Sequence, residues 1–158
     1  MLRLFLAVCC VASVMTQPAG AQALLNRDSW RPSFENDPQG GVLCVWSIYI
    51  SIQRIGAVCF PEETAFQTAL DETVRRMDDF IIANMPTTRE VLDAARREGL
   101  RMSGTDEIVP QRCRGSDRRA RDMLNMYRHS RMSGADSMRA EVDRLLATPR
   151  RPSMNPCL

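Results

Sequence analysis

Apolar side chains recur at steps of three and four between residues 42 and 60, which is the spacing of one face of an α-helix. The positions on this face are Cys44, Ile48, Ile52, Ile55 and Cys59. Residues 48–52 nearly alternate between apolar and polar side chains and are rich in β-branched residues, which also suits a strand. The helical pattern is the more regular of the two. We therefore predict a central buried helix, with a β-hairpin as the alternative.

Four further helices follow, each with start and stop signals of its own. Pro61 opens the second helix, which ends before Pro86. The third follows the capping-box sequence that starts at Thr87 and includes Glu90. The third helix is predicted to end at Gly99 or Met102, and a loop covers residues 103–115. The fourth helix begins after Ser116 or Asp117 and ends at Ser133-Gly134. The fifth helix covers residues 136–146.

The segments on either side of these helices carry turn-forming residues rather than a helical pattern. Residues 24–41 read as an N-terminal arm that Trp30 and Phe34 anchor to the core, and residues 149–158, with three prolines, as an extended C-terminal tail. The helical domain then covers residues 42–148. The predicted fold is all-α, a small up-and-down bundle of about five helices.

The first 23 residues have the pattern of a cleavable secretory signal peptide. Arg3 supplies the positive charge, residues 4–14 form a short apolar stretch, and Ala21-Gln22-Ala23 matches the small-x-small cleavage pattern. We predict cleavage after Ala23 and export to the periplasm, or secretion as the alternative. The mature chain is not expected to span the membrane, because its uninterrupted apolar run covers only residues 42–52.

Four cysteines remain after residue 23, an even number that predicts two disulfides in an oxidising compartment. If residues 42–60 form one helix, Cys44 and Cys59 lie about 22 Å apart along its axis and cannot bond to each other. In an up-and-down bundle the chain returns to the Cys59 end before Cys113. We predict Cys59–Cys113 and Cys44–Cys157, the second of which ties the tail to the first helix. A zinc site is not expected, because there is no CxxC pair and only one histidine.

All 21 basic side chains are arginine, and removal of Arg3 leaves 20 against 19 acidic residues, so the mature chain is nearly neutral. The charge is uneven: residues 112–131 hold seven arginines and two aspartates, a balance of +5. This stretch is a candidate anion-binding surface. Its leading residues are Arg112, Arg114, Arg118, Arg119 and Arg121. In the alternative interpretation, the same helix packs beside residues 62–79, where six acids and two arginines give −4.

The motifs of common enzymes are missing from the sequence. It has no GxSxG, HExxH or P-loop pattern. The single histidine, His129, stands late in the fourth helix, where a cation complements the helix dipole. The acidic pairs Glu62-Glu63, Asp71-Glu72 and Asp78-Asp79 are expected on a solvated helix face rather than as the acid/base pair of a glycosidase. No catalytic residue, metal or cofactor is predicted.

These observations favour a non-catalytic exported protein of the binding, inhibitor or immunity type, which presents a rigid helical surface to a protein of the cell envelope. The alternative is a protein that binds or hydrolyses an envelope polymer, such as peptidoglycan or an acidic glycan. Lipid headgroups are a further ligand class for the arginine-rich stretch. Nucleic acid is not an expected partner, because an exported chain rarely meets it and Tyr127 is the only aromatic residue among these arginines.

Overall fold

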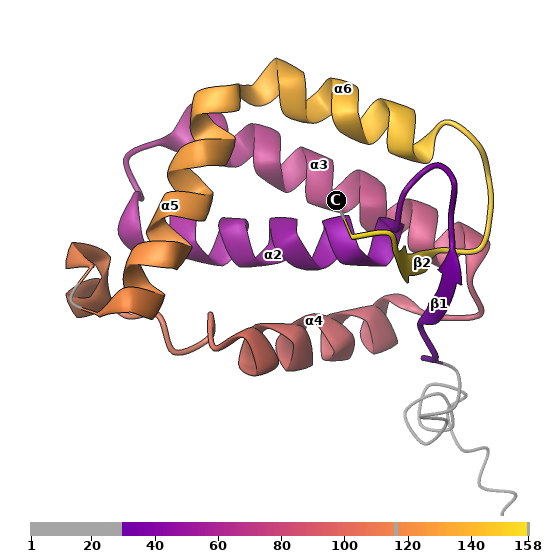
Figure 1. Cartoon of the computed structure of the whole chain (residues 1–158), viewed down its shortest axis with the longest axis horizontal. Coiled ribbons are helices and arrows are strands. Elements are labelled where there is room, and N and C mark those ends of the chain that lie inside the picture. The colour runs from indigo at the N-terminus through magenta and orange to yellow at the C-terminus, as the bar shows by residue number, and fades with distance from the viewer. Residues whose placement is uncertain (1–29, 116, 158) are drawn as a thin grey trace, which may run out of the picture.

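The computed structural model describes residues 30–115 and 117–157, so the predicted signal peptide lies outside the described residues. Figure 1 shows a bundle of helices with one of them at its centre and two short strands at one end. The elements are β1 (Ser33–Asn36), α2 (Val42–Cys59), α3 (Thr64–Asn84), α4 (Arg89–Ser103), the 3₁₀-helix η2 (Pro110–Arg114), α5 (Arg118–Ser133), α6 (Ala135–Leu146) and β2 (Ser153–Asn155). The all-α prediction is confirmed.

The central element is α2, which packs against α3, α4 and α5. It is a single helix over Val42–Cys59, so the helical prediction is confirmed and the hairpin alternative is wrong. Most of its side chains are buried, including Trp46, Ile50 and Ile55. Among the described helices, α2 alone is long and apolar enough to cross a membrane by length and composition. Its burial between the other helices accounts for that composition.

The helices α2, α3 and α4 lie side by side, and each runs in the opposite direction to the one before it (Figure 1). Helix α5 crosses one end of this layer, and α6 runs back along α3 (Figure 1). The core lies between them. Tyr127 of α5 is fully buried and stacks on Phe60, with ring centroids 4.4 Å apart. Phe66 of α3 meets the same ring edge-on at 5.6 Å. This aromatic cluster joins the end of α2, the start of α3 and the middle of α5.

Two helix starts differ from the sequence prediction. The second helix begins at Thr64 instead of Pro61, because the chain first makes a turn that the side chain of Gln67 stabilises by donating to the carbonyls of Gly56 and Phe60. The third helix is capped by Thr88 rather than Thr87. The Thr88 hydroxyl accepts a hydrogen bond from the backbone N–H of Val91, as an N-cap residue should.

The remaining boundaries lie close to their predicted positions. Helix α4 ends at Ser103, where Gly104 takes the left-handed conformation that commonly closes a helix. Asp117 caps α5, and its carboxylate accepts from the N–H of Ala120. The predicted loop over residues 103–115 contains the short helix η2.

The N-terminal arm and the C-terminal tail pair as the parallel strands β1 and β2, which the sequence did not predict. Arg150 fixes this junction. Its guanidinium forms an ion pair with Asp37 at 2.6 Å and donates to the carbonyls of Leu145 and Gly40. The tail passes so close to Gly41 that a Cβ there would lie 2.7 Å from the backbone of Met154. The start of α2 is therefore enclosed by its own two flanking segments.

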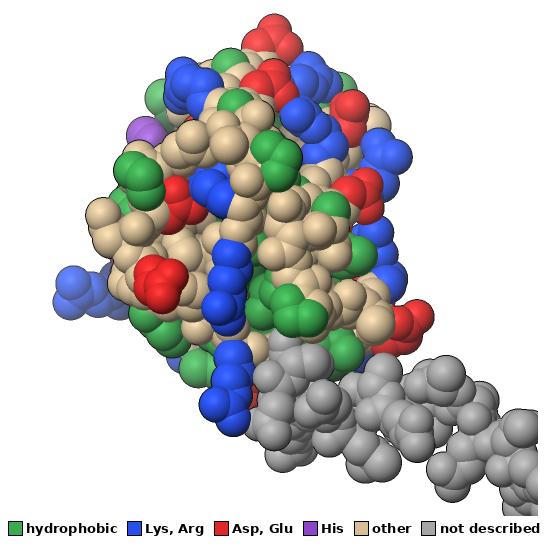
Figure 2. Space-filling view, turned by 90° about the vertical axis from the view of Figure 1, so that its right-hand side faces the viewer, with side chains coloured by type: hydrophobic (Ala, Val, Ile, Leu, Met, Phe, Trp, Pro, Cys, Tyr) green, Lys and Arg blue, Asp and Glu red, His purple; other side chains and the backbone are tan. Residues whose placement is uncertain are grey.

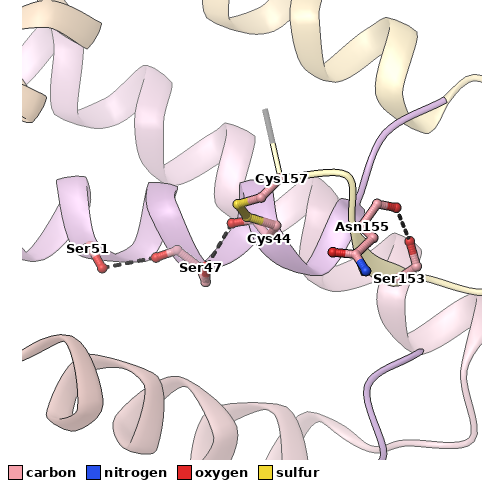
Figure 3. The surroundings of a disulfide bond; sticks show 6 residues. All are labelled: Cys44, Ser47, Ser51, Ser153, Asn155 and Cys157. Atoms are coloured by element: carbon pink, nitrogen blue, oxygen red, sulfur yellow. Dashed lines mark hydrogen bonds between the residues drawn. A yellow bond between two sulfur atoms is a disulfide. The ribbon is translucent and has the colours of Figure 1, made fainter. Parts of the chain in front are cut away.

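Both predicted disulfides are present. Cys44 bonds to Cys157 with the Cα atoms 5.4 Å apart, and Cys59 bonds to Cys113 with a Cα separation of 5.3 Å. Figure 3 shows the first of them at α2, with Ser47 and Ser51 farther along the same helix. Two disulfides indicate an oxidising, extracytoplasmic location, because cytosolic thiols are kept reduced.

Candidate functional site

A groove of about 1130 Å³ lies between α2 and α4. Its long sides are α2, from Leu43 to Ser51, and α4, from Val91 to Ser103. Met126 of α5 lines one end, and Trp30, Pro32 and Met154 line the other. Figure 1 shows α5 and the strand pair at opposite ends of α2, which agrees with this arrangement.

Small side chains create the open space. Ser47 and Ser51 on α2 and Ala95 and Gly99 on α4 line the groove. A Cβ added to Gly99 would come no closer to a neighbour than 3.7 Å, at Ile50. Protein interiors are closely packed, so two helices of one bundle leave open space between them where the side chains that face each other are small.

The serines of the groove do not make it polar. The Ser47 hydroxyl donates to the carbonyl of Cys44 at 2.7 Å, and the Ser51 hydroxyl donates to the carbonyl of Ser47 at 3.0 Å (Figure 3). Ser103 donates in the same way to the carbonyl of Leu100. Because these donors are already satisfied within their own helices, the groove suits an apolar ligand.

A buried carboxylate holds α4 at this distance from α2. Asp78 of α3 accepts a hydrogen bond from the indole N–H of Trp46 at 2.7 Å and forms ion pairs with Arg96 at 2.6 Å and Arg89 at 3.2 Å. The Arg96 guanidinium also lies 5.9 Å from the centroid of the Trp46 ring. The network joins α2, α3 and α4, and it fixes a tryptophan that lines the groove.

The outer rim of the groove is exposed. Met102, at the end of α4, is 74% exposed, which is unusual for a large apolar side chain. Glu98, one turn earlier, accepts hydrogen bonds from Arg101, and this contact lowers the pKa of Glu98. The rim thus combines an adaptable thioether with charged side chains.

Comparisons with protein-family models, with curated proteins and with solved structures find no match.

The predicted anion-binding arginines lie away from the groove, around η2 and the start of α5, and most of them have partners in the chain. Arg112 faces Glu107 at 3.7 Å, Arg118 faces Asp122 at 4.0 Å, and Arg121 donates to the carbonyl of Gly115. Arg119 donates to the carbonyl of Ser103 at 2.5 Å and so joins α5 to the end of α4. Arg114 is exposed and has no such contact among the described residues. The structure gathers these residues at one end of the bundle.

The alternative pairing of residues 112–131 with residues 62–79 is largely wrong. Helix α5 packs on α2 and α6, and it meets the acidic stretch at its beginning, where Arg131 pairs with Glu63 at 2.6 Å and Tyr127 contacts Glu63 and Phe66. The other acids of α3 meet arginines of α4 and α6 instead, because those helices lie along α3. The pairs are Asp78–Arg89, Asp79–Arg89, Asp78–Arg96 and Glu72–Arg139.

The acidic pairs serve as structural contacts. Asp71 accepts from the amide of Gln53, and Glu63 accepts from the hydroxyl of Tyr127 at 3.0 Å. His129 is exposed on α5. Within residues 30–115 and 117–157, no three histidine, cysteine, aspartate or glutamate side chains stand close enough to hold a metal ion.

Sequence reasoning did not find the groove. Its residues were visible only as a polar face of the first helix, Ser47 and Ser51, and as small members of the apolar stripe of the third, Ala94 and Ala95. The sequence feature that points to the groove is the small size of these side chains. The residues of α4 that line the groove include Ala94, Ala95 and Gly99, which are too small to fill the space against α2.

Proposed function

We propose that this chain is an exported, non-catalytic binding protein of the periplasm, which holds the apolar face of a helix from an envelope protein in its α2–α4 groove. The observation that carries the proposal is the groove itself. It is large, lined by apolar side chains and satisfied hydroxyls, and fixed in width by the Asp78 network.

The shape of the groove suits a helix better than a small molecule. Val91 and Ser103 are twelve residues apart on α4, which corresponds to about 18 Å or three helical turns. Small-molecule sites are usually more enclosed and bury most of the ligand. Here the rim is exposed along α4, and an amphipathic helix can cover such a groove with apolar anchors at every third or fourth position. Methionines at the rim and the ends, such as Met102 and Met126, adapt to a partner surface.

Export rests on the N-terminal pattern and on the disulfides. An AxA-type cleavage site after residue 23 and two disulfides fit one compartment outside the cytoplasm. N-terminal sequencing of protein recovered from the producing cell is expected to start at Leu24. An intact Met1 with free thiols would contradict export.

The alternative, a binder or hydrolase of an envelope polymer acting through the arginine-rich stretch, has less support. The guanidinium groups of Arg112, Arg118, Arg119 and Arg121 are engaged within the chain.

Site-specific photocrosslinking in the producing cell tests the proposal. A photoreactive residue replaces Met102 at the groove rim or, as a matched control, Met132 at the end of α5, which is 84% exposed. We expect a discrete protein adduct from position 102 and none from position 132. A helix of the captured protein, made as a peptide, should then compete for the adduct. An adduct with lipid or glycan, or identical adducts from both positions, would overturn the proposal.

A second measurement uses the two tryptophans of the chain, Trp30 and Trp46, because both line the groove. Binding of the peptide should change the intrinsic fluorescence. Ala95→Leu places a larger side chain in the groove and should abolish binding. Ala140→Leu, on the exposed face of α6, is the control and should bind normally. Equal binding by both variants would show that the groove is not the site.

A further inference from the structure

A recess of about 610 Å³ adjoins the groove at the C-terminal half of α4. Three arginines line it, Arg54 from α2 and Arg97 and Arg101 from α4. Ala94 and Glu98 line both the recess and the groove, so the two cavities share a wall. An occupant of the groove therefore passes next to the recess.

Two of the three guanidinium groups are uncommitted. Arg101 is paired with Glu98, whereas Arg54 and Arg97 make no ion pair or side-chain hydrogen bond within the described residues. Both are exposed. Asp106 also lines the recess, so its three arginines and two acids leave a balance of +1. This is positive charge held beside an apolar groove.

The position of this charge specifies the partner. We propose that the helix bound in the groove carries acidic side chains beside its apolar stripe, and that their carboxylates bind Arg54 and Arg97. The inference rests on the proposed function and adds the chemical class of the partner, an acidic amphipathic helix. A guanidinium matches the planar carboxylate with two parallel hydrogen bonds, so each pair also fixes orientation.

The two arginines stand on different helices, Arg54 on α2 and Arg97 on α4, and both line the recess that adjoins the groove. A helix lying between α2 and α4 presents one flank of its apolar stripe to the recess, and side chains three or four residues apart lie on the same flank. Carboxylates on this flank of such a helix can therefore reach both groups. A partner with basic flanks would instead place like charges next to Arg54 and Arg97, and this repulsion selects against it.

Two synthetic helical peptides of about fourteen residues test the inference. They share one leucine stripe and differ only in the flanking residues, which are glutamate in one and lysine in the other. Titration is followed by the fluorescence of the native, disulfide-bonded protein. At low salt we expect the glutamate peptide to bind roughly tenfold more tightly, since two rim pairs and the removal of repulsion each contribute a few-fold. The ratio should shrink in about 0.3 M salt because the charges are exposed.

The double variant Arg54→Gln/Arg97→Gln should remove the preference for the glutamate peptide. Arg128→Gln/Arg144→Gln removes the same charge from exposed positions on α5 and α6 and should leave the preference intact. A preference that persists in the first variant, or vanishes equally in both, would overturn the inference and indicate a general charge effect.

The two proposals fail differently. If both peptides bind equally and Ala95→Leu abolishes both, the acidic-helix inference is wrong and the groove remains a helix-binding site. If neither peptide binds, or if Ala95→Leu changes nothing, the proposed function itself falls. Sodium palmitate and vesicles of anionic phospholipid serve as a third probe. Saturable binding of these that requires Arg54 and Arg97, without binding of the glutamate peptide, would assign the site to a lipid and overturn both proposals.

Discussion

Asp78 is the residue on which the geometry of the groove depends most directly. Its side chain is 7% exposed, and it accepts from Trp46 while pairing with Arg96, whose side chain is 23% exposed. A buried ion pair adds little net stability compared with apolar packing, but loss of one partner leaves a buried charge uncompensated. The network therefore sets the position of α4 more than it adds to overall stability.

Asp78→Ala is expected to lower the free energy of unfolding by about 3 kcal/mol, because it leaves Arg96 and the Trp46 indole N–H without their acceptor. Asp79→Ala removes an exposed carboxylate next to it and should cost less than about 1 kcal/mol. Urea unfolding followed by circular dichroism measures both. Equal losses in the two variants would mean that the buried network does not hold α4.

The two tyrosines of the chain respond to alkaline pH in the same direction. Burial, followed by the charge of Glu141, raises the pKa of Tyr49, and burial, followed by the hydrogen bond to Glu63, raises the pKa of Tyr127. In the unfolded chain both phenols ionise near pH 10. The folded state thus holds protons that the unfolded state releases, so its stability is complete below about pH 10 and decreases as the pH rises further.

We therefore expect phenolate absorbance near 295 nm to appear together with the loss of helical circular dichroism, rather than before it. The variant Tyr49→Phe/Tyr127→Phe should lose stability less steeply above about pH 10. Phenolate formation near pH 10 in a protein that keeps its native circular dichroism would contradict this expectation.

At the level of helices, replacement of two glycines by alanine is expected to have opposite effects on stability. Gly99 lies in α4, where a new Cβ would make an ordinary contact at 3.7 Å with Ile50. Gly56 lies in α2, where a Cβ would come within 2.7 Å of the ring of Tyr127. The first glycine stands beside the groove, whereas the second lets α2 and α5 pack closely.

Gly99→Ala should therefore stabilise the protein by about 0.5–1 kcal/mol, the gain in helix propensity of alanine over glycine. Gly56→Ala should destabilise it by about 1–3 kcal/mol, since the aromatic ring must move to admit the methyl group. Thermal unfolding of the two variants gives the comparison. A stabilising Gly56→Ala or a strongly destabilising Gly99→Ala would show that α4 and α5 pack on α2 differently from this structure.

On the scale of the whole molecule, the two disulfides connect distant parts of the chain. Cys59–Cys113 joins residues 54 apart, and Cys44–Cys157 joins residues 113 apart. The entropy of closing such loops in the unfolded chain corresponds to about 4 and 5 kcal/mol. The second bond also retains the tail that carries Met154, a residue at one end of the groove.

Replacing either cysteine pair by serine is expected to cost about 2–5 kcal/mol in urea unfolding. The pairs should differ in binding. Loss of Cys44–Cys157 frees the end of the groove and should weaken the glutamate peptide several-fold, whereas loss of Cys59–Cys113 should not at temperatures where the protein stays folded. Equal effects on binding would mean that the tail does not shape the groove.

Neither sign of charge dominates the face of the molecule that carries the two strands (Figure 2). Figure 2 shows acidic and basic side chains mixed over the end of the molecule that carries the two strands, with hydrophobic side chains between them. Specific attraction to a partner must then come from local groups such as Arg54 and Arg97 rather than from net charge, which is +2 for the full sequence.

The sequence alone determined the helices and the cysteine pairing. Apolar periodicity and capping residues act within one or two turns, so the pattern around Cys44 and Cys59 identified one helix, and its length excluded a bond between them. Once the helices alternate in direction, Cys113 and Cys157 each have one reachable partner.

Only the tertiary structure decided the groove, the pairing of β1 with β2 and the partners of the charged residues. Ser47 and Ala95 lie far apart in sequence, and the space between them depends on where Asp78 holds α4. The direction in which α5 crosses the bundle likewise decided that the acids of α3 meet arginines of α4 and α6. The spacing of apolar residues within a helix indicates which of its faces is buried. The space left between two helices depends on how all the other helices pack, so the spacing of apolar residues in one helix does not predict it.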